Sequence, residues 1–95
     1  MLDPAEQVER GRQAAELLRH PILTAALDAI EAEVVEQWGD CPARDSEGKE
    51  ALWQLLKTSK KFRAILTGYV NSGKLSAENL KRFEEKRGLR AVFGR

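Results

Sequence analysis

The sequence predicts an all-α protein, built as an elongated antiparallel helical hairpin with short flanking N- and C-terminal helices. Three observations lead to this fold class. Apolar residues recur at steps of three and four along most of the chain, which is the period of amphipathic helices. Proline and glycine stand between these stretches, where helices begin and end. The 95 residues are 42% hydrophobic and 33% charged, which is ordinary for one folded domain over residues 1–95.

The first helix is expected to begin at Asp3-Pro4 and to stop before His20-Pro21. Aspartate is a good N-cap, and proline is tolerated at the first helical position. Proline also disfavours a helical residue before it, so a new helix should begin at Pro21. The apolar side of the first helix has only Val8, Ala14, Ala15 and Leu18, with Gly11 in the middle, so this helix needs tertiary contacts to persist.

Two longer helices should form the hairpin. The second carries a narrow apolar stripe and is expected to stop at Gly39; the stripe consists of Leu23, Leu27, Ile30, Val34 and Trp38. The third should begin at Asp45 or Ser46, either of which can cap it, and run to about Asn71. Some 25 residues of helix span about 38 Å. A compact globule of this length has a radius of gyration of only about 12 Å, so an elongated hairpin is favoured.

A short final helix and a tail complete the expected fold. Asn71-Ser72-Gly73 is predicted to end the third helix, and Ser76 to cap a last helix that closes at Gly88. Residues 90–95 should form a flexible basic tail.

The net charge of +1 conceals a strong asymmetry. Residues 1–48 carry eleven acidic and four basic groups, a net charge of −7, whereas residues 49–95 carry four acidic and twelve basic groups, a net charge of +8. Such a division fits an acidic helix folded on a basic one, head-to-tail self-assembly, or a basic face for nucleic acid.

The chain shows the features of a cytoplasmic protein. Its single cysteine, Cys41, cannot form an internal disulfide, which favours a reducing compartment. No run of residues is long and apolar enough for a membrane span, and the acidic N-terminus does not have the form of a signal peptide.

One segment resembles a phosphate-binding loop but lacks its chemistry. Residues 68–76 nearly match the pattern of Gly, four residues, Gly, Lys and Ser or Thr, yet Leu75 follows Lys74 where the hydroxyl must stand to reach magnesium. The motif also requires a preceding strand, whereas Gly68 lies in an amphipathic stretch. We therefore interpret the segment as a connection between two helices.

No other constellation predicts catalysis, a metal or a cofactor. His20 is the only histidine and lies at a predicted helix junction. Cys41 lies in a loop with no adjacent base. The sequence therefore predicts a binding protein rather than an enzyme, with no cofactor.

Candidate binding residues come from tryptophan and from the basic positions. Trp38 continues an apolar stripe and should be buried, whereas Trp53 falls at the edge of the next stripe, where tryptophan often marks an interface. The candidate partner-binding set is Trp53, Lys81, Arg82, Lys86, Arg87, Arg90, Val92 and Phe93. The alternative nucleic-acid-binding set is Lys57, Lys60, Lys61, Lys81 and Arg82, although a solvated face is the favoured interpretation of these positions.

Several short landmarks together resemble small all-helical proteins that tailed bacteriophages and prophages encode among their virion-assembly genes. The landmarks are Arg10-Gly11 to Leu18, the helix from His20-Pro21 to Trp38, Asp45 to Leu52-Trp53, and Gly73-Lys74-Leu75. The resemblance implies a non-enzymatic protein that associates with itself or with a phage structural or packaging protein. It would act in the host cytoplasm or in association with the virion.

The expected function is therefore protein–protein interaction in virion assembly or DNA packaging, with a homo-oligomer as the favoured state. Two alternatives stay open at this point: a nucleic-acid-binding module such as a small packaging-recognition subunit, and a phage-encoded inhibitor of a host protein. Membrane binding is not expected.

Overall fold

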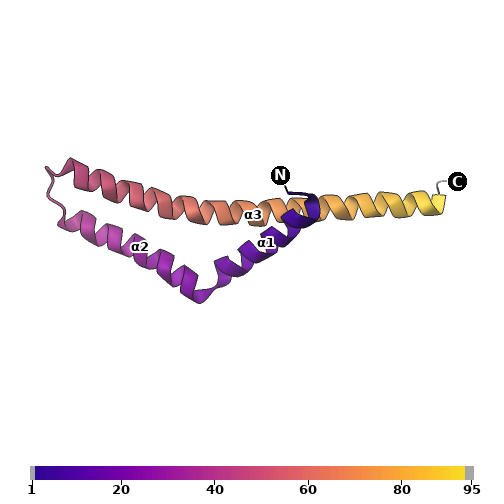
Figure 1. The fold of residues 1–95 in the computed structure, drawn as a ribbon, viewed down its shortest axis with the longest axis horizontal. Coiled ribbons are helices and arrows are strands. Elements are labelled where there is room, and N and C mark those ends of the chain that lie inside the picture. The colour runs from indigo at the N-terminus through magenta and orange to yellow at the C-terminus, as the bar shows by residue number, and fades with distance from the viewer. Residues whose placement is uncertain (1, 94–95) are drawn as a thin grey trace. The chain divides into compact units, whose positions relative to one another are not determined.

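The chain is all-α. The computed structural model describes the backbone of residues 2–93 and the side chains of residues 2–88. Within this part, three helices follow one another along the chain: α1 (Pro4–Arg19), α2 (Pro21–Asp40) and α3 (Ser46–Phe93) (Figure 1). None of these helices is long and apolar enough to cross a membrane.

The beginnings of the helices follow the predicted caps. The Asp3 carboxylate accepts a hydrogen bond of 2.8 Å from the Glu6 backbone N–H, and this bond holds the pKa of Asp3 below its usual value. His20 separates α1 from α2 as predicted, and its Nδ1 accepts a hydrogen bond of 3.2 Å from the Ile22 N–H. Asp45 caps α3 by accepting a 2.9 Å bond from the Gly48 N–H.

The end of α2 differs in detail from the prediction. α2 includes Gly39 and ends at Asp40, and no described glycine has a positive φ. Cys41 instead adopts an extended conformation and donates its backbone N–H to the Trp38 carbonyl at 3.3 Å. Gly39 therefore does not supply the left-handed turn that commonly closes a helix.

The predicted break at Asn71-Ser72-Gly73 is wrong, and with it the separate short C-terminal helix. α3 passes through these residues without interruption to Phe93. Ser76 does not cap a new helix but lies buried within α3, where its hydroxyl hydrogen-bonds to the Gln7 side chain. A glycine in a helix interior is unfavourable by about 1 kcal/mol relative to alanine, and here tertiary contacts of Gly73 offset that preference.

The contacts within the chain divide it into two units. Unit 1 consists of Met1–Ala15 and Leu66–Arg95, and unit 2 of Glu16–Ile65. The prediction of a single domain stays a prediction. The same holds for the flexible tail at residues 90–95: the backbone of residues 90–93 belongs to α3, and residues 94–95 lie outside the described part.

Unit 1 is a close crossing of two antiparallel helices. Gln7 of α1 contacts Ser76 of α3, and Gly11, one turn further along α1, meets Gly73. The buried residues of this unit are mostly small: Gly11, Ala14, Leu66, Gly73 and Ser76.

Unit 2 pairs α2 with the first part of α3. The five-residue connection at residues 41–45 joins the two helices at one end, and they run side by side in opposite directions (Figure 1). Two contacts fix their register: Lys49 lies over the Trp38 ring, and Arg63 pairs with Asp28. The core of this pair is thin, with Leu27, Val34 and Leu52 as its buried apolar side chains.

Candidate interaction surface

An apolar hollow opens on one side of the α2–α3 pair in unit 2. It has a volume of about 280 Å³ and is lined by Val34, Val35 and Trp38 of α2 and by Trp53 and Leu56 of α3. Val34 forms its buried floor, at 3% exposure, whereas Val35, Trp38 and Trp53 are 70%, 42% and 48% exposed. Two tryptophans that share one open hollow are an arrangement typical of binding hot spots.

Lysines from α3 lie against both tryptophans. The Lys49 ammonium is 4.9 Å from the centre of the Trp38 ring, and that of Lys57 is 5.9 Å from the centre of the Trp53 ring. Ammonium groups within about 6 Å of an indole face are attracted by its quadrupole. The rim of the hollow on the α3 side is therefore both aromatic and positively charged.

An ion cluster also joins α2 to α3 in unit 2. The Arg63 Nη2 is 2.7 Å from the Asp28 carboxylate, and the Arg63 Nε is 3.3 Å from the Glu31 carboxylate. The first contact is a hydrogen bond, whereas the second is an attraction between charges without hydrogen-bond geometry. The Arg63 and Glu31 side chains are about one-third exposed, at 31% and 34%, which strengthens this pairing relative to a fully solvated one.

A second row of exposed apolar side chains follows another face of α3 in unit 2. Leu55, Phe62 and Ile65 are 45%, 45% and 42% exposed. Their spacing of seven and three residues places them on one side of the helix. The α2–α3 pair therefore leaves large apolar groups uncovered on more than one face.

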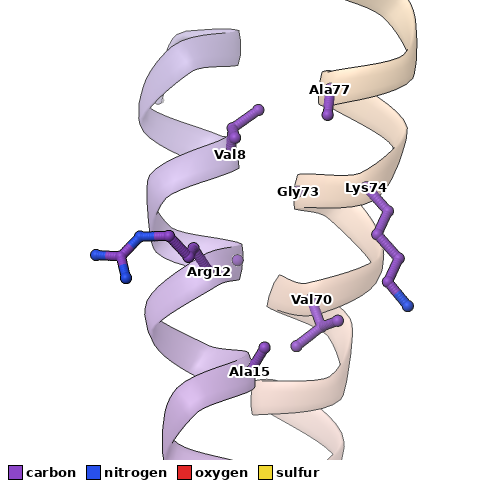
Figure 2. A pocket seen from close by; sticks show the side chains of 8 residues that line it. Val8, Arg12, Ala15, Val70, Gly73, Lys74 and Ala77 are labelled. Atoms are coloured by element: carbon purple, nitrogen blue, oxygen red, sulfur yellow. The ribbon is translucent and has the colours of Figure 1, made fainter.

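Unit 1 has a smaller groove where α1 crosses α3. Its volume is about 210 Å³, and Figure 2 shows Val8 and Ala15 of α1 pointing toward Ala77 and Val70 of α3. The Arg12 and Lys74 side chains extend away from the crossing (Figure 2). Small side chains bring the two backbones together here, so the groove offers little area to a partner.

The contacts of this crossing are specific. A Cβ added at Gly11 would lie 2.8 Å from the Tyr69 carbonyl oxygen and 2.9 Å from the Gly73 Cα. The Arg10 guanidinium lies 4.0 Å from the centre of the Tyr69 ring. The absence of a side chain at Gly11 is therefore what allows the two helices to approach so closely.

The residues predicted to bind a partner fall in different places. Trp53 lines the hollow of unit 2. Lys81, Arg82, Lys86 and Arg87 lie exposed on α3 in unit 1, where Arg82 pairs with Glu78 at 2.8 Å. The side chains of Arg90, Val92 and Phe93 lie outside the described residues.

The candidate nucleic-acid residues are also divided. Lys57, Lys60 and Lys61 are exposed in unit 2, whereas Lys81 and Arg82 belong to unit 1. Of these residues, Lys57 lies near the hollow, over the Trp53 ring.

Sequence reasoning missed Trp38 and Val35. Trp38 was expected in the core but is 42% exposed; it lies in the last turn of α2, and Lys49 of α3 lies over its ring. Val35 is off the buried stripe, but it stands three residues before Trp38 and is therefore on the same side of the helix. An off-stripe valine beside a terminal tryptophan was the available indication of a surface patch.

The surroundings of Cys41 and of residues 68–76 do not favour the chemistry considered for them. Partial burial raises the pKa of the Cys41 thiol, and the Asp45 carboxylate raises it further, which disfavours the nucleophilic thiolate. Residues 68–76, the near-match to a phosphate-binding loop, are helical throughout. Among the described residues, no three His, Cys, Asp or Glu side chains gather where they could hold a metal ion.

Comparison of the chain with protein families, with curated proteins and with solved structures gives no match.

Proposed function

We propose that this chain is a non-enzymatic, self-associating interaction protein of phage type that acts in virion assembly or DNA packaging. Its working element is the α2–α3 pair as an elongated antiparallel hairpin. The observation that carries the proposal is the imbalance in unit 2, where exposed large apolar side chains outnumber buried ones. The exposed set is Leu17, Ile22, Val35, Trp38, Trp53, Leu55, Phe62 and Ile65.

The physical argument for association rests on the thin core of this pair. Burying one large apolar side chain contributes about 1.5–3 kcal/mol. Leu27, Val34 and Leu52 are the buried apolar side chains that hold α2 to the first part of α3. A helical pair with so little core gains stability when another protein surface covers its remaining apolar groups.

Sedimentation equilibrium over a wide concentration range tests self-association. We expect a reversible oligomer whose charged contribution weakens as salt is added, because salt screens pairs of exposed charges. A strict monomer at every concentration and at low salt contradicts the proposal.

The place of action is tested separately. We expect the chain to be made in the host cytoplasm and to co-sediment with capsids or their precursors in a gradient of lysate from phage-producing cells. Recovery only in fractions that contain neither capsid nor packaging proteins removes the assembly part of the proposal. Stable capture of one host enzyme, with loss of that enzyme's activity, supports the inhibitor alternative instead.

Nucleic-acid binding is the second candidate, and one observation favours it. Lys57, Lys60 and Lys61 are all exposed, and Trp53 next to them presents an aromatic surface on which a base could stack. A gel-shift titration with duplex and single-stranded DNA tests this candidate. Binding whose affinity falls steeply with salt supports it, and no shift at low salt removes it.

A further inference from the structure

The two helices that line the hollow of unit 2 carry opposite charges. α2 carries five acidic residues and no basic one: Asp28, Glu31, Glu33, Glu36 and Asp40. The part of α3 in unit 2 carries five basic residues, Lys49, Lys57, Lys60, Lys61 and Arg63, against the two acids Glu47 and Glu50. One helix of the pair is thus negative, and its neighbour is positive.

Four of these charged residues lie on the same face as the hollow. Asp28, Glu31 and Val35 are spaced by three and four residues on α2, so the two carboxylates lie on the side of Val35. On α3, Lys57 and Lys60 follow Trp53 by four and seven residues and lie on the side of that tryptophan. The face therefore has an acidic rim, an apolar centre and a basic rim.

We propose that the face around the hollow packs against the same face of a second copy. A twofold axis parallel to the helices relates the two copies. This inference rests on the proposed self-association and specifies its geometry. Rotation about such an axis places α2 of one copy over α3 of the other, so that each acidic rim meets a basic rim. An axis perpendicular to the helices would instead set one α2 against the other, with five carboxylates on each.

The register of the pair gives the contacts across the axis. The contacts of Lys49 with Trp38 and of Arg63 with Asp28 and Glu31 place these two carboxylates within about one helical turn of Lys57 and Lys60 along the pair. Rotation about an axis parallel to the helices preserves these levels. Glu31 of one copy thus faces Lys57 of the second copy, and Asp28 faces Lys60 of the second copy.

The resulting assembly is a four-helix bundle in which neighbouring helices are antiparallel. α2 and α3 are antiparallel within a copy, and the same axis makes α2 antiparallel to α3 of the second copy. A face two helices wide and some 20 residues long offers on the order of 600 Å² per copy. The total reaches the lower end of the area that stable interfaces bury, about 1,200–2,000 Å².

Two complementary charge reversals test the geometry in the full chain. An acidic variant carries Lys57→Glu and Lys60→Glu, and a basic variant carries Asp28→Lys and Glu31→Lys. In the acidic variant both rims of the face are negative, and in the basic variant both rims are positive. Each variant alone should dimerise at least about tenfold more weakly than the natural chain, because like charges then face each other.

The mixture of the two variants gives the decisive measurement. In a mixed dimer, the negative α2 rim of the acidic variant faces the positive α3 rim of the basic variant. At the other rim, the negative α3 of the acidic variant faces the positive α2 of the basic variant. Sedimentation of the mixture should therefore show a dimer at concentrations at which each variant alone is mostly monomeric. The control variant, Arg19→Glu with Lys74→Glu, changes net charge by the same amount at exposed positions outside the α2–α3 face and should dimerise like the natural chain.

The outcomes separate this inference from the proposed function. If the natural chain is monomeric, self-association itself fails. If the natural chain is oligomeric but the acidic variant associates as well as the control, the twofold geometry is overturned and self-association stands. The basic variant also loses the partners of Arg63, so circular dichroism must show that it has native helicity before it is mixed. If its helicity is not native, the acidic variant alone still tests the geometry.

Discussion

The two units of this chain each pack two antiparallel helices, but in opposite ways. Unit 1 brings α1 and α3 together over small residues, and at Gly11 the backbones nearly touch. Unit 2 separates α2 and α3 with larger side chains and leaves Trp38 and Trp53 about half exposed beside an open hollow. The first arrangement completes its packing internally, whereas the second does not.

This difference indicates a division of roles between the two units, stability for unit 1 and association for unit 2. A close crossing held by glycine leaves little apolar surface and tolerates no added atoms, so its effect is on stability. A pair whose aromatic side chains are uncovered gains most from a partner, so its effect is on association. The following substitutions test this division, beginning with the largest expected effect.

Gly11→Ala should destabilise the chain by about 2–3 kcal/mol, measured as the shift of its urea or thermal unfolding transition. The new Cβ would stand 2.8 Å from the Tyr69 carbonyl oxygen and 2.9 Å from the Gly73 Cα. Both neighbours are backbone atoms, which cannot move aside as a flexible side chain can. This effect should outweigh the roughly 1 kcal/mol by which alanine favours a helix over glycine.

The same substitution at Gly68 is the matched control. A Cβ at Gly68 has no neighbouring atom within 4 Å, and this glycine also lies within a helix, α3. Gly68→Ala should therefore stabilise the chain by up to about 1 kcal/mol. Equal shifts for the two variants would show that the crossing of α1 and α3 is not close in solution.

Trp53→Ala should weaken self-association by about 2 kcal/mol, roughly thirtyfold, with a smaller effect on the helicity of the monomer. Trp53 is 48% exposed and lines the hollow, so its truncation removes contact area for a partner rather than core. Sedimentation equilibrium measures the loss. Ile22→Ala, at an apolar residue that is 72% exposed and outside the lining of the hollow, should leave association unchanged.

The sequence predicted the elements of unit 2 better than those of unit 1. The features that predicted unit 2 are local: Pro21, Asp45 and the stripe that includes Leu27 and Val34. Local features decide where helices begin and which side is buried. The hollow itself was not predictable, because it depends on the register between α2 and α3. Composition and periodicity do not fix that register.

Gly73 shows why the prediction failed in unit 1. Asn71-Ser72-Gly73 has the composition of a helix end, and propensity alone favours a break there. The structure instead uses Gly73 for the approach of α1, since a Cβ at this position would stand 3.0 Å from the Gly11 Cα. The contact partner lies 62 positions away in the sequence (73 minus 11), and no local pattern reveals it.

Arg63→Met should destabilise unit 2 by about 1 kcal/mol. Methionine retains much of the aliphatic contact of arginine but removes the charge that holds Asp28 and Glu31. The effect is modest because Asp28 is 67% exposed, and solvent screens such pairs. Urea unfolding at low and high salt measures it, and the difference between the natural chain and the variant should shrink as salt is added. A difference that is unchanged by salt would assign the role of Arg63 to packing.

Ser59→Ala should have the smallest effect and the opposite sign, stabilising the chain by about 0.5–1 kcal/mol. Ser59 is 5% exposed in unit 2, and its hydroxyl oxygen has no hydrogen-bond partner among the described residues. Removing a buried hydroxyl that lacks a partner relieves its desolvation penalty, and alanine also favours the helix. Ser72→Ala, at an exposed serine of the same helix, isolates the contribution of helix propensity. Thermal unfolding of the three chains gives the comparison. If Ser59→Ala destabilises while Ser72→Ala does not, the hydroxyl has a partner in solution, and unit 2 is packed more completely than its exposed tryptophans indicate.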